Sequence, residues 1–177
     1  MRQTILADVG IVSLTRNPWS VLMWSHYADK HTGFMVEFEI RSTFTKEQKG
    51  HEDRWLVAFD VKYVSERPSV SYWGRTDMSD VEKTFTYKSE EWEYEQEERV
   101  IKYSGGAGAF PFEPELLTSV IAGSRISESN FQLLKNSIRA ANKTRQKKIK
   151  LYRAEIDQKD FKLNIPKFSR PRLVMAK

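Results

Sequence analysis

The segment EWEYEQEER, residues 91–99, places charged residues at every second position. If the segment is a strand, alternate side chains point to one face, about 6.8 Å apart. That face then carries Glu93, Glu95, Glu97 and Arg99. Clustered carboxylates raise at least one pKa, and an arginine partly neutralises them. Such a group can hold a base or stabilise a developing cation.

An ordinary structural role is the alternative for the same segment. It is then a solvated charged edge, or a helix in which Glu95 and Arg99 form a pair four residues apart. Trp92 and Tyr94 fall on the opposite face of the predicted strand and would anchor it against a core. Their position favours the interpretation as a site.

Two of the chain's three histidines, His26 and His31, lie five residues apart. On a helix, five residues turn through about 500°, so the side chains point about 140° apart and share no metal-binding face. No metal is therefore expected, although a hydrolase using both histidines and the acids is the third hypothesis. His26 is either a wall of a ligand pocket, acting as a hydrogen-bonding group or base, or a buried histidine beside core aromatics Trp24 and Tyr27.

The basic residues gather near the C-terminus. Residues 131–177 hold 14 Lys and Arg against three acids, giving +11, so the remainder carries −6 of the net +5. Lys135, Arg139 and Lys143 recur every fourth residue and form a stripe on the predicted helix. The predicted partner surface comprises Lys135, Arg139, Lys143, Arg145, Lys147 and Lys148. It is either a surface for phosphate or another anionic macromolecule, or a solvated helix face, since no aromatic residues are interleaved with these charges.

Composition limits the class of protein. The 177 residues are 40% hydrophobic and 30% charged, which is typical of a globular chain. The absence of cysteine excludes disulfides, thiol nucleophiles and cysteine-based metal sites. No run approaches the roughly 18 apolar residues of a membrane span, and MRQTILADVG has no signal-peptide pattern. We expect a cytoplasmic protein that does not enter a membrane.

Elements that position these residues can be predicted from hydrophobic periodicity. Strands are expected at residues 10–15, 33–40, 55–64, 91–103, 116–123 and 149–156. A short helix should follow Ser20, a second helix is expected over residues 79–89, and Ser127 should cap a third with Phe131, Leu134, Ile138 and Ala141 on one face. Residues 41–54 are predicted to form a polar loop or frayed helix.

The fold class follows from the order of these elements. Strands outnumber helices and do not alternate with them, which favours an α+β fold with a mixed or mostly antiparallel sheet and a few flanking helices. We expect one domain over residues 1–165 and a basic tail over residues 166–177.

A family resemblance rests on four stretches of sequence. They are LMWSHYADKHTGF from Leu22, Lys88 with WEYEQEER from Trp92, VIAGSR from Val120 and IKLYRA from Ile149. Together they resemble an uncharacterised bacterial domain-of-unknown-function family over roughly residues 10–165. The resemblance implies a setting among phage, plasmid and defence genes, and no activity is settled for that family.

The chain also distantly resembles mono-ADP-ribosyltransferases. Val12-Ser13-Leu14-Thr15 is similar to their central strand, and Glu95-Gln96-Glu97 to their late acidic motif. That resemblance implies NAD as cofactor, with Glu97 stabilising an oxocarbenium-like ribose, Glu95 orienting the acceptor and Ser13 supporting the site.

The same resemblance implies a nicotinamide pocket lined by His26 and Tyr27. In the predicted set, His26 joins Glu95 and Glu97 as catalytic, while Ser13, Tyr27, His31 and Arg99 bind the cofactor. The sequence departs from the transferase pattern at its start, because only ten residues precede Ile11 and leave almost no room for an early Arg or His strand.

Two functions are therefore expected. The first is ADP-ribosyl transfer from NAD to a macromolecule at a site built from the His26 to His31 segment and the acidic strand. The alternative is a non-catalytic protein that binds a host or defence factor, or a nucleic acid, through its basic C-terminal helix.

Overall fold

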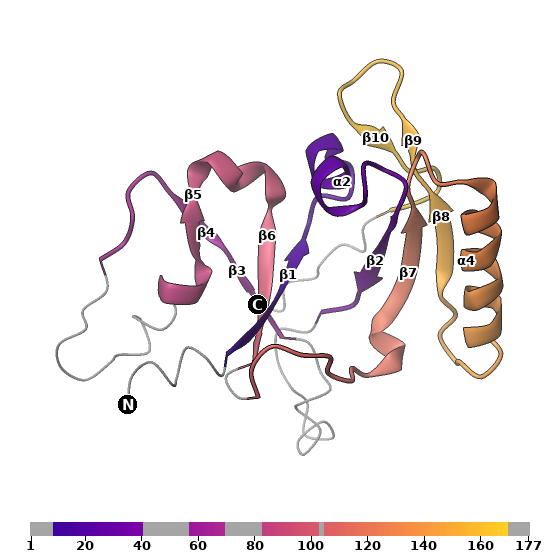
Figure 1. Cartoon of the computed structure of the whole chain (residues 1–177), viewed down its shortest axis with the longest axis horizontal. Helices are drawn as coiled ribbons and strands as arrows, with labels where there is room; N and C mark the ends of the chain where they lie inside the picture. The colour runs from indigo at the N-terminus through magenta and orange to yellow at the C-terminus, as the bar shows by residue number, and fades with distance from the viewer. Residues whose placement is uncertain (1–8, 41–56, 70–82, 103–104, 170–177) are drawn as a thin grey trace. The chain divides into compact units, whose positions relative to one another are not determined.

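The structure analysed is a computed structural model that describes residues 9–40, 57–69, 83–102 and 105–169 (Figure 1). By internal contacts the chain divides into two compact units, Met1–Asn17 with Glu39–Leu116, and Pro18–Phe38 with Leu117–Lys177. Helices and several mostly antiparallel sheets confirm the α+β class. A single domain over residues 1–165 stays a prediction, and the residues of the predicted loop at 41–54 lie outside the described part.

The first unit contains an antiparallel sheet in the order β1-β6-β3. Strand β1 is Gly10–Thr15, β6 is Glu97–Lys102 and β3 is Ala58–Asp60. In the register of β1 with β6, Ser13 lies opposite Arg99 and Thr15 opposite Glu97. The strand predicted at residues 10–15 is confirmed. Its pairing places Ser13 on the strand next to the one that carries Glu97 and Arg99.

A second, parallel pair of strands completes this unit. It joins β4 (Lys62–Val64) to β5 (Tyr87–Ser89). The single strand predicted at residues 55–64 is wrong in part, because the chain changes sheets at Val61, whose backbone N–H donates to the Glu97 carbonyl. Of the helix predicted over residues 79–89, only residues 83–86 are helical, and β5 follows them directly. Residues 79–82 lie outside the described part.

The segment predicted as one strand over residues 91–103 is not continuous. Residues Glu90–Glu95 form the 3-10 helix η3, and Gln96 then adopts a left-handed backbone with φ 44° before β6 begins. Glutamates are poor strand formers and tolerate a helical turn well. The alternating charged residues that predicted one strand therefore lie in two elements, η3 and β6.

In the second unit the sheet order is β2-β7-β8. Strand β2 (Phe34–Phe38) runs antiparallel to β7 (Leu117–Ala122), and β8 (Lys150–Arg153) runs parallel to β7. Helix α4 (Glu128–Ala141) packs against one face of this sheet (Figure 1). Its Ile138 forms a buried cluster with Val120 and Ile149. The predicted strands at 33–40 and 116–123 are confirmed.

The caps predicted for both helices are present. Ser20 precedes α2 (Val21–Tyr27) and accepts from the Met23 N–H, and Ser127 precedes α4 and accepts from the Asn130 N–H. A side-chain oxygen at this position satisfies one of the free N–H groups of the first turn.

The opposite face of the second sheet carries the larger core of the unit. Trp24 of α2 is fully buried there with Ile121 and Ala154. Its indole N–H donates to the Pro18 carbonyl at 2.7 Å, which satisfies the one polar group of the ring. Two short strands, β9 (Glu155–Ile156) and β10 (Leu163–Asn164), form a hairpin whose Leu163 and following Ile165 close this core.

The predicted final strand at residues 149–156 is interrupted. Ala154, buried between β8 and β9, donates its N–H to the Ala122 carbonyl, and the chain then leaves the sheet to enter the hairpin. Among the described residues, no helix has the length and apolar character needed to cross a membrane.

Candidate functional site

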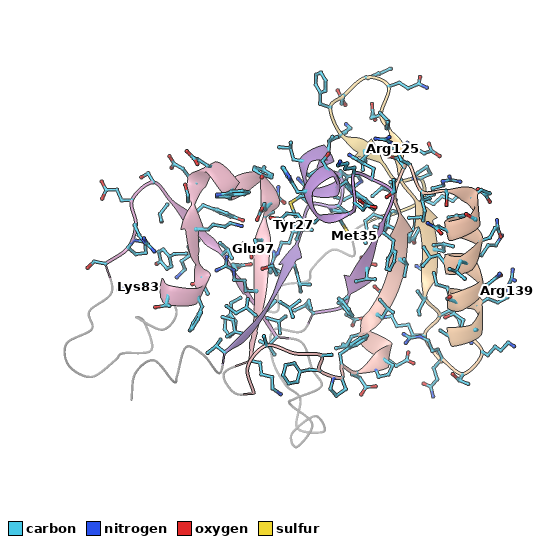
Figure 2. The ribbon with its side chains drawn as sticks, viewed as in Figure 1. Tyr27, Met35, Lys83, Glu97, Arg125 and Arg139 are labelled. Atoms are coloured by element: carbon cyan, nitrogen blue, oxygen red, sulfur yellow. The ribbon has the colours of Figure 1, made fainter. Side chains whose placement is uncertain are left out.

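The predicted acidic site is found as a cluster of opposite charges in the first unit. Its members, called the charge cluster below, are Lys88, Glu95, Glu97 and Arg99. Arg99 Nε donates to Glu97 Oε1 at 2.8 Å and its Nη2 to Oε2 at 3.1 Å, a bidentate pair. Lys88 Nζ lies 3.0 Å from Glu97 Oε2 and also donates to Glu95. Both carboxylates are thus held by cations, and Figure 2 shows Glu97 at the start of β6.

The members reach this cluster from three elements instead of one strand face. Glu95 is the last residue of η3, and the left-handed turn at Gln96 brings it beside Glu97. The predicted positions of Glu93 and Trp92 are wrong, since Glu93 is exposed on η3 and Trp92 is 39% exposed, while Tyr94 is partly buried on the same element. Trp92 instead lies under the Lys88 ammonium, 5.0 Å from the ring centre.

Electrostatics in the cluster favour the ionised form of Glu97. Burial by itself would raise the pKa of this carboxyl, but hydrogen bonds from Arg99, Ser13 and Lys88 outweigh it and lower the pKa to about 2. Burial lowers and the two glutamates raise the pKa of Lys88, and the net direction is upward. Glu97 is therefore a fixed negative charge and not a proton acceptor near neutral pH.

Strand β1 also contributes side chains next to the charge cluster. Ser13 is one of the side chains that lower the pKa of the Glu97 carboxyl. Thr15 donates its hydroxyl to the Glu95 carbonyl and so holds the end of η3. Tyr63 of β4 accepts from the Glu97 N–H at 2.7 Å, while burial raises the pKa of its phenol.

The histidine segment lies in the second unit. His26 is exposed in the last turn of α2 and meets the ring of Tyr27 edge-on, with centres 6.2 Å apart. Tyr27 is 65% exposed, so the alternative in which His26 and Tyr27 are buried is wrong, while Trp24 is a core residue as predicted. His26, Tyr27 and His31 belong to one unit and Ser13, Glu95, Glu97 and Arg99 to the other. Their convergence on one site stays a prediction.

His31 is fixed by a left-handed turn after α2. Asp29, Lys30 and His31 have φ of 45°, 52° and 71°. The turn is stabilised by the Thr32 hydroxyl, which donates to Asp29, and by the Gly33 N–H, which donates to the Ala28 carbonyl. The imidazole stacks on Trp24 with ring centres 6.5 Å apart. These contacts hold the His31 side chain in one defined position.

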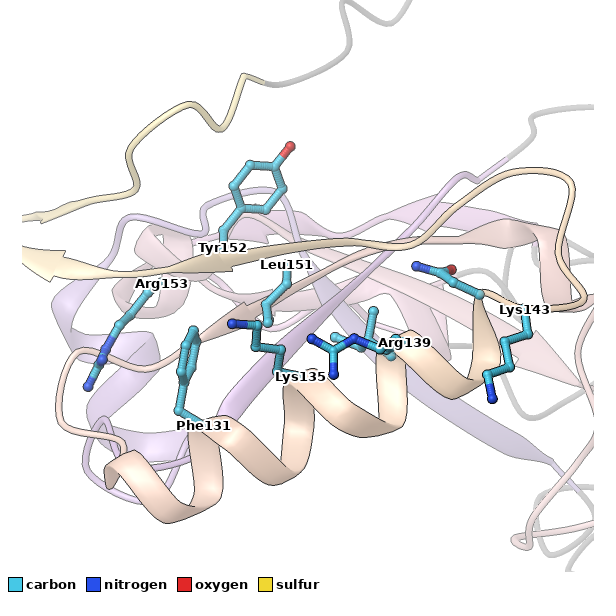
Figure 3. A pocket seen from close by; sticks show the side chains of 9 residues that line it. Phe131, Lys135, Arg139, Lys143, Leu151, Tyr152 and Arg153 are labelled. Carbon is cyan, nitrogen blue, oxygen red and sulfur yellow. The ribbon is translucent and has the colours of Figure 1, made fainter.

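The basic stripe predicted on the C-terminal helix borders a groove between α4 and β8 (Figure 3). The groove, called the basic groove, has a volume of about 530 Å³. Its cations are Lys135, Arg139, Lys143 and Arg153, and its apolar floor comes from Phe131, Ile138 and Leu151. None of the described residues that line it is acidic.

The rest of the predicted basic surface has structural contacts. Arg145 donates to the carbonyls of Lys147 and Leu117, which ties the segment after α4 to the first residue of β7. Lys148 donates to the carbonyls of Asn142 and Arg145 at the end of α4, where free carbonyls carry partial negative charge. Both side chains therefore stabilise the turn that leads into β8.

Sequence reasoning missed three participants. In the sequence, Lys88 is marked only as part of the family resemblance, and Tyr63 only as a residue of a predicted strand. Arg153 comes from β8, and its guanidinium lies 5.0 Å from the centre of the Phe131 ring and 3.3 Å from Glu128. No local signal marks these residues, because each joins its site through a contact at least seven residues away in the chain.

Within residues 9–40, 57–69, 83–102 and 105–169, no three histidine or acidic side chains are grouped to hold a metal ion. The comparisons with known proteins give one similarity. Residues 23–100 match a family described as a protein of unknown function (DUF2971). No curated protein and no solved structure matches the chain.

Proposed function

We propose that the protein binds a nucleic acid through the basic groove, in the cytoplasm and without catalysis. The observation that carries the proposal is that the groove gathers four cations and no carboxylate among its described lining residues. A surface of this kind attracts phosphates and releases their counterions on binding.

Geometry along α4 supports this function. Lys135 and Arg139 stand on successive turns of α4, about 6 Å apart along the helix axis, and Lys143 follows two residues after the helix ends. None of the three forms an ion pair with a described carboxylate. Like charges four residues apart on a helix repel each other and cost a few tenths of a kcal/mol. A polyanion would relieve that repulsion.

The apolar floor adds a second type of contact. Phe131 is partly exposed at one end of the groove, with the Arg153 guanidinium over its ring. Bases stack on aromatic rings and on guanidinium planes, so this end suits an unpaired base. The phage, plasmid and defence setting implied by the family resemblance is compatible with a nucleic-acid partner, and a host protein is the other partner to test.

Fluorescence anisotropy with labelled single-stranded and duplex oligonucleotides tests the proposal. We expect wild-type affinity to fall with salt, and Lys135→Gln/Lys143→Gln to weaken binding and reduce the salt slope by about 2. The matched control Lys150→Gln/Lys167→Gln removes the same charge outside the groove and should preserve most of the affinity. Equal losses in both variants, or no binding by the wild type, would refute the proposal and leave a protein partner to be sought.

ADP-ribosyl transfer from NAD is the second candidate, favoured by one specific observation. Ser13 on β1 lowers the pKa of Glu97 on the neighbouring strand β6, and the resemblance to transferases gives Ser13 a supporting role at such an acid. Cleavage of the bond to nicotinamide develops positive charge on the ribose, and an ionised Glu97 suits its stabilisation. Lys88 and Arg99 suit the pyrophosphate by charge, although both are already paired with acids.

Release of nicotinamide from NAD, followed by chromatography, tests the second candidate. Wild-type protein should release it, and Ser13→Ala should slow the release while keeping the fold. A folded wild-type protein that neither releases nicotinamide nor gains thermal stability from NAD excludes this function, because a ligand of the folded state must stabilise it.

A further inference from the structure

A second cavity in the same unit lies between the hairpin β9–β10 and the left-handed turn that carries His31. We call it the hairpin cavity; its volume is about 450 Å³, within the range of small-molecule sites. Val21, Ile156 and Leu163 supply apolar wall, and His31 and Arg125 supply polar groups from the other side. It shares no lining residue with the basic groove.

The charges of the hairpin are largely used within the hairpin. Asp157 accepts the backbone N–H groups of Lys159 and Asp160, and Lys162 lies 2.6 Å from the Asp160 carboxylate. Arg125 differs from them: its backbone N–H donates to the His31 carbonyl, and its exposed guanidinium has no ion pair with a described carboxylate. The lining therefore holds three cations and two carboxylates, and Arg125 and Lys159 are its cations without an ion pair to a described carboxylate.

The tautomer of His31 follows from its neighbour. The single hydroxyl hydrogen of Ser25 is donated to the Val21 carbonyl at 2.8 Å. We assign the ring hydrogen to Nε2, which then donates to the Ser25 oxygen at 2.9 Å. His31 Nδ1 is then an acceptor, and it is buried without a hydrogen-bond partner among the described residues.

Holding His31 in this position costs free energy. Three consecutive residues other than glycine in the left-handed region are unfavourable, and such strain concentrates at functional sites. Gly123 is required beside the turn, because a β-carbon there would collide with the His31 carbonyl oxygen. An unsatisfied buried nitrogen adds a further cost, which a bound partner removes.

We propose that the hairpin cavity binds a small organic anion that carries a hydroxyl next to its charged group. The anionic group pairs with Arg125, the hydroxyl donates to His31 Nδ1, and the carbon skeleton contacts the apolar wall. Because Nδ1 is covered, the His31 ring or the hairpin moves slightly when the ligand enters. This site is separate from the basic groove and does not depend on the function proposed for it.

NMR titration of the ¹⁵N-labelled protein tests the proposal with malate and glycerol 3-phosphate as probes and neutral glycerol as the control. We expect malate or glycerol 3-phosphate to shift the signals of His31, Arg125 and Gly123, and glycerol to leave them unchanged. The two anions distinguish a carboxylate from a phosphate ligand. Arg125→Gln, which keeps the backbone bond to His31, should weaken binding at least about tenfold.

The control variant is Arg139→Gln, which removes the same charge from the basic groove and should preserve binding at the hairpin cavity. The proposal is overturned if neither anion shifts these signals, or if Arg139→Gln weakens binding as much as Arg125→Gln. It is also overturned if the shifts cluster at Lys135 and Lys143, since the anion then binds the basic groove.

Discussion

The charge cluster and the basic groove each contain four charged side chains, but their signs are mixed in the first and uniform in the second. In the charge cluster the side chains of Lys88, Glu95 and Glu97 are 22%, 3% and 4% exposed, and every carboxylate has a cationic partner. In the basic groove the cations are exposed, and of the four only Arg153, 3.3 Å from Glu128, forms an ion pair with a described carboxylate.

This difference teaches how charge is used in the two places. A buried charge is tolerated when it is paired, and removing one partner leaves the other uncompensated. Exposed like charges contribute little to the stability of the fold, and they remain able to interact with a bound molecule. The charge cluster should therefore dominate stability, and the basic groove should dominate binding.

The largest expected effect is that of Glu97→Gln on stability. Loss of this carboxylate leaves Arg99 and Lys88 without their main partner, so the free energy of unfolding should fall by about 3–5 kcal/mol. Urea unfolding followed by circular dichroism measures the change. Glu91→Gln, an exposed acid on η3, is the control and should alter stability by less than about 0.5 kcal/mol. Similar values for both variants would break the comparison.

Acid should reproduce part of this effect in the wild type. The folded pKa of Glu97 is about 2 and its ordinary value is 4.5, so below that value the unfolded chain takes up a proton that the folded chain does not. Stability present above about pH 4.5 is then lost as pH falls toward 2, by about 3 kcal/mol. Urea unfolding at several values between about pH 5 and about pH 2 measures this slope. The Glu97→Gln variant should lack it, and a slope of the same size in that variant would assign the effect to other groups.

A smaller effect separates two cations of the C-terminal segment. Arg145→Gln loses bonds to the carbonyls of Leu117 and Lys147 and should lower the free energy of unfolding by about 1–2 kcal/mol. Lys143→Gln, two residues earlier and exposed, is its matched control and should change stability little. Thermal unfolding of the two variants measures the difference, and the reverse order would show that the structural role lies in the groove.

The smallest effect is expected for Lys135→Gln. This change removes a like charge four residues from Arg139, so the unfolding free energy should stay within about 0.5 kcal/mol of wild type. Differential scanning calorimetry at low ionic strength, where charge repulsion is least screened, measures it. A loss above about 1 kcal/mol would mean that Lys135 has a structural role, as Arg145 does.

Several elements of the fold follow from local sequence signals. The helix caps at Ser20 and Ser127 and the strands at 10–15, 33–40 and 116–123 were predictable, since capping and alternation depend on near neighbours. The breaks at Val61, Gln96 and Ala154 were not. Each is set by a backbone conformation or a hydrogen bond to a distant segment, and apolar or alternating letters continue across it.

The candidate sites divide in the same way. By itself the sequence determined an α+β class, a group comprising Glu95, Glu97 and Arg99, and a cationic stripe on a C-terminal helix, because residue type and spacing carry that information. Only the tertiary structure decided that Lys88 joins Glu97, that Arg153 lines the basic groove while Arg145 does not, and that His31 stacks on Trp24. These contacts depend on strand pairing and on turns that bring distant segments together, and no local pattern encodes them.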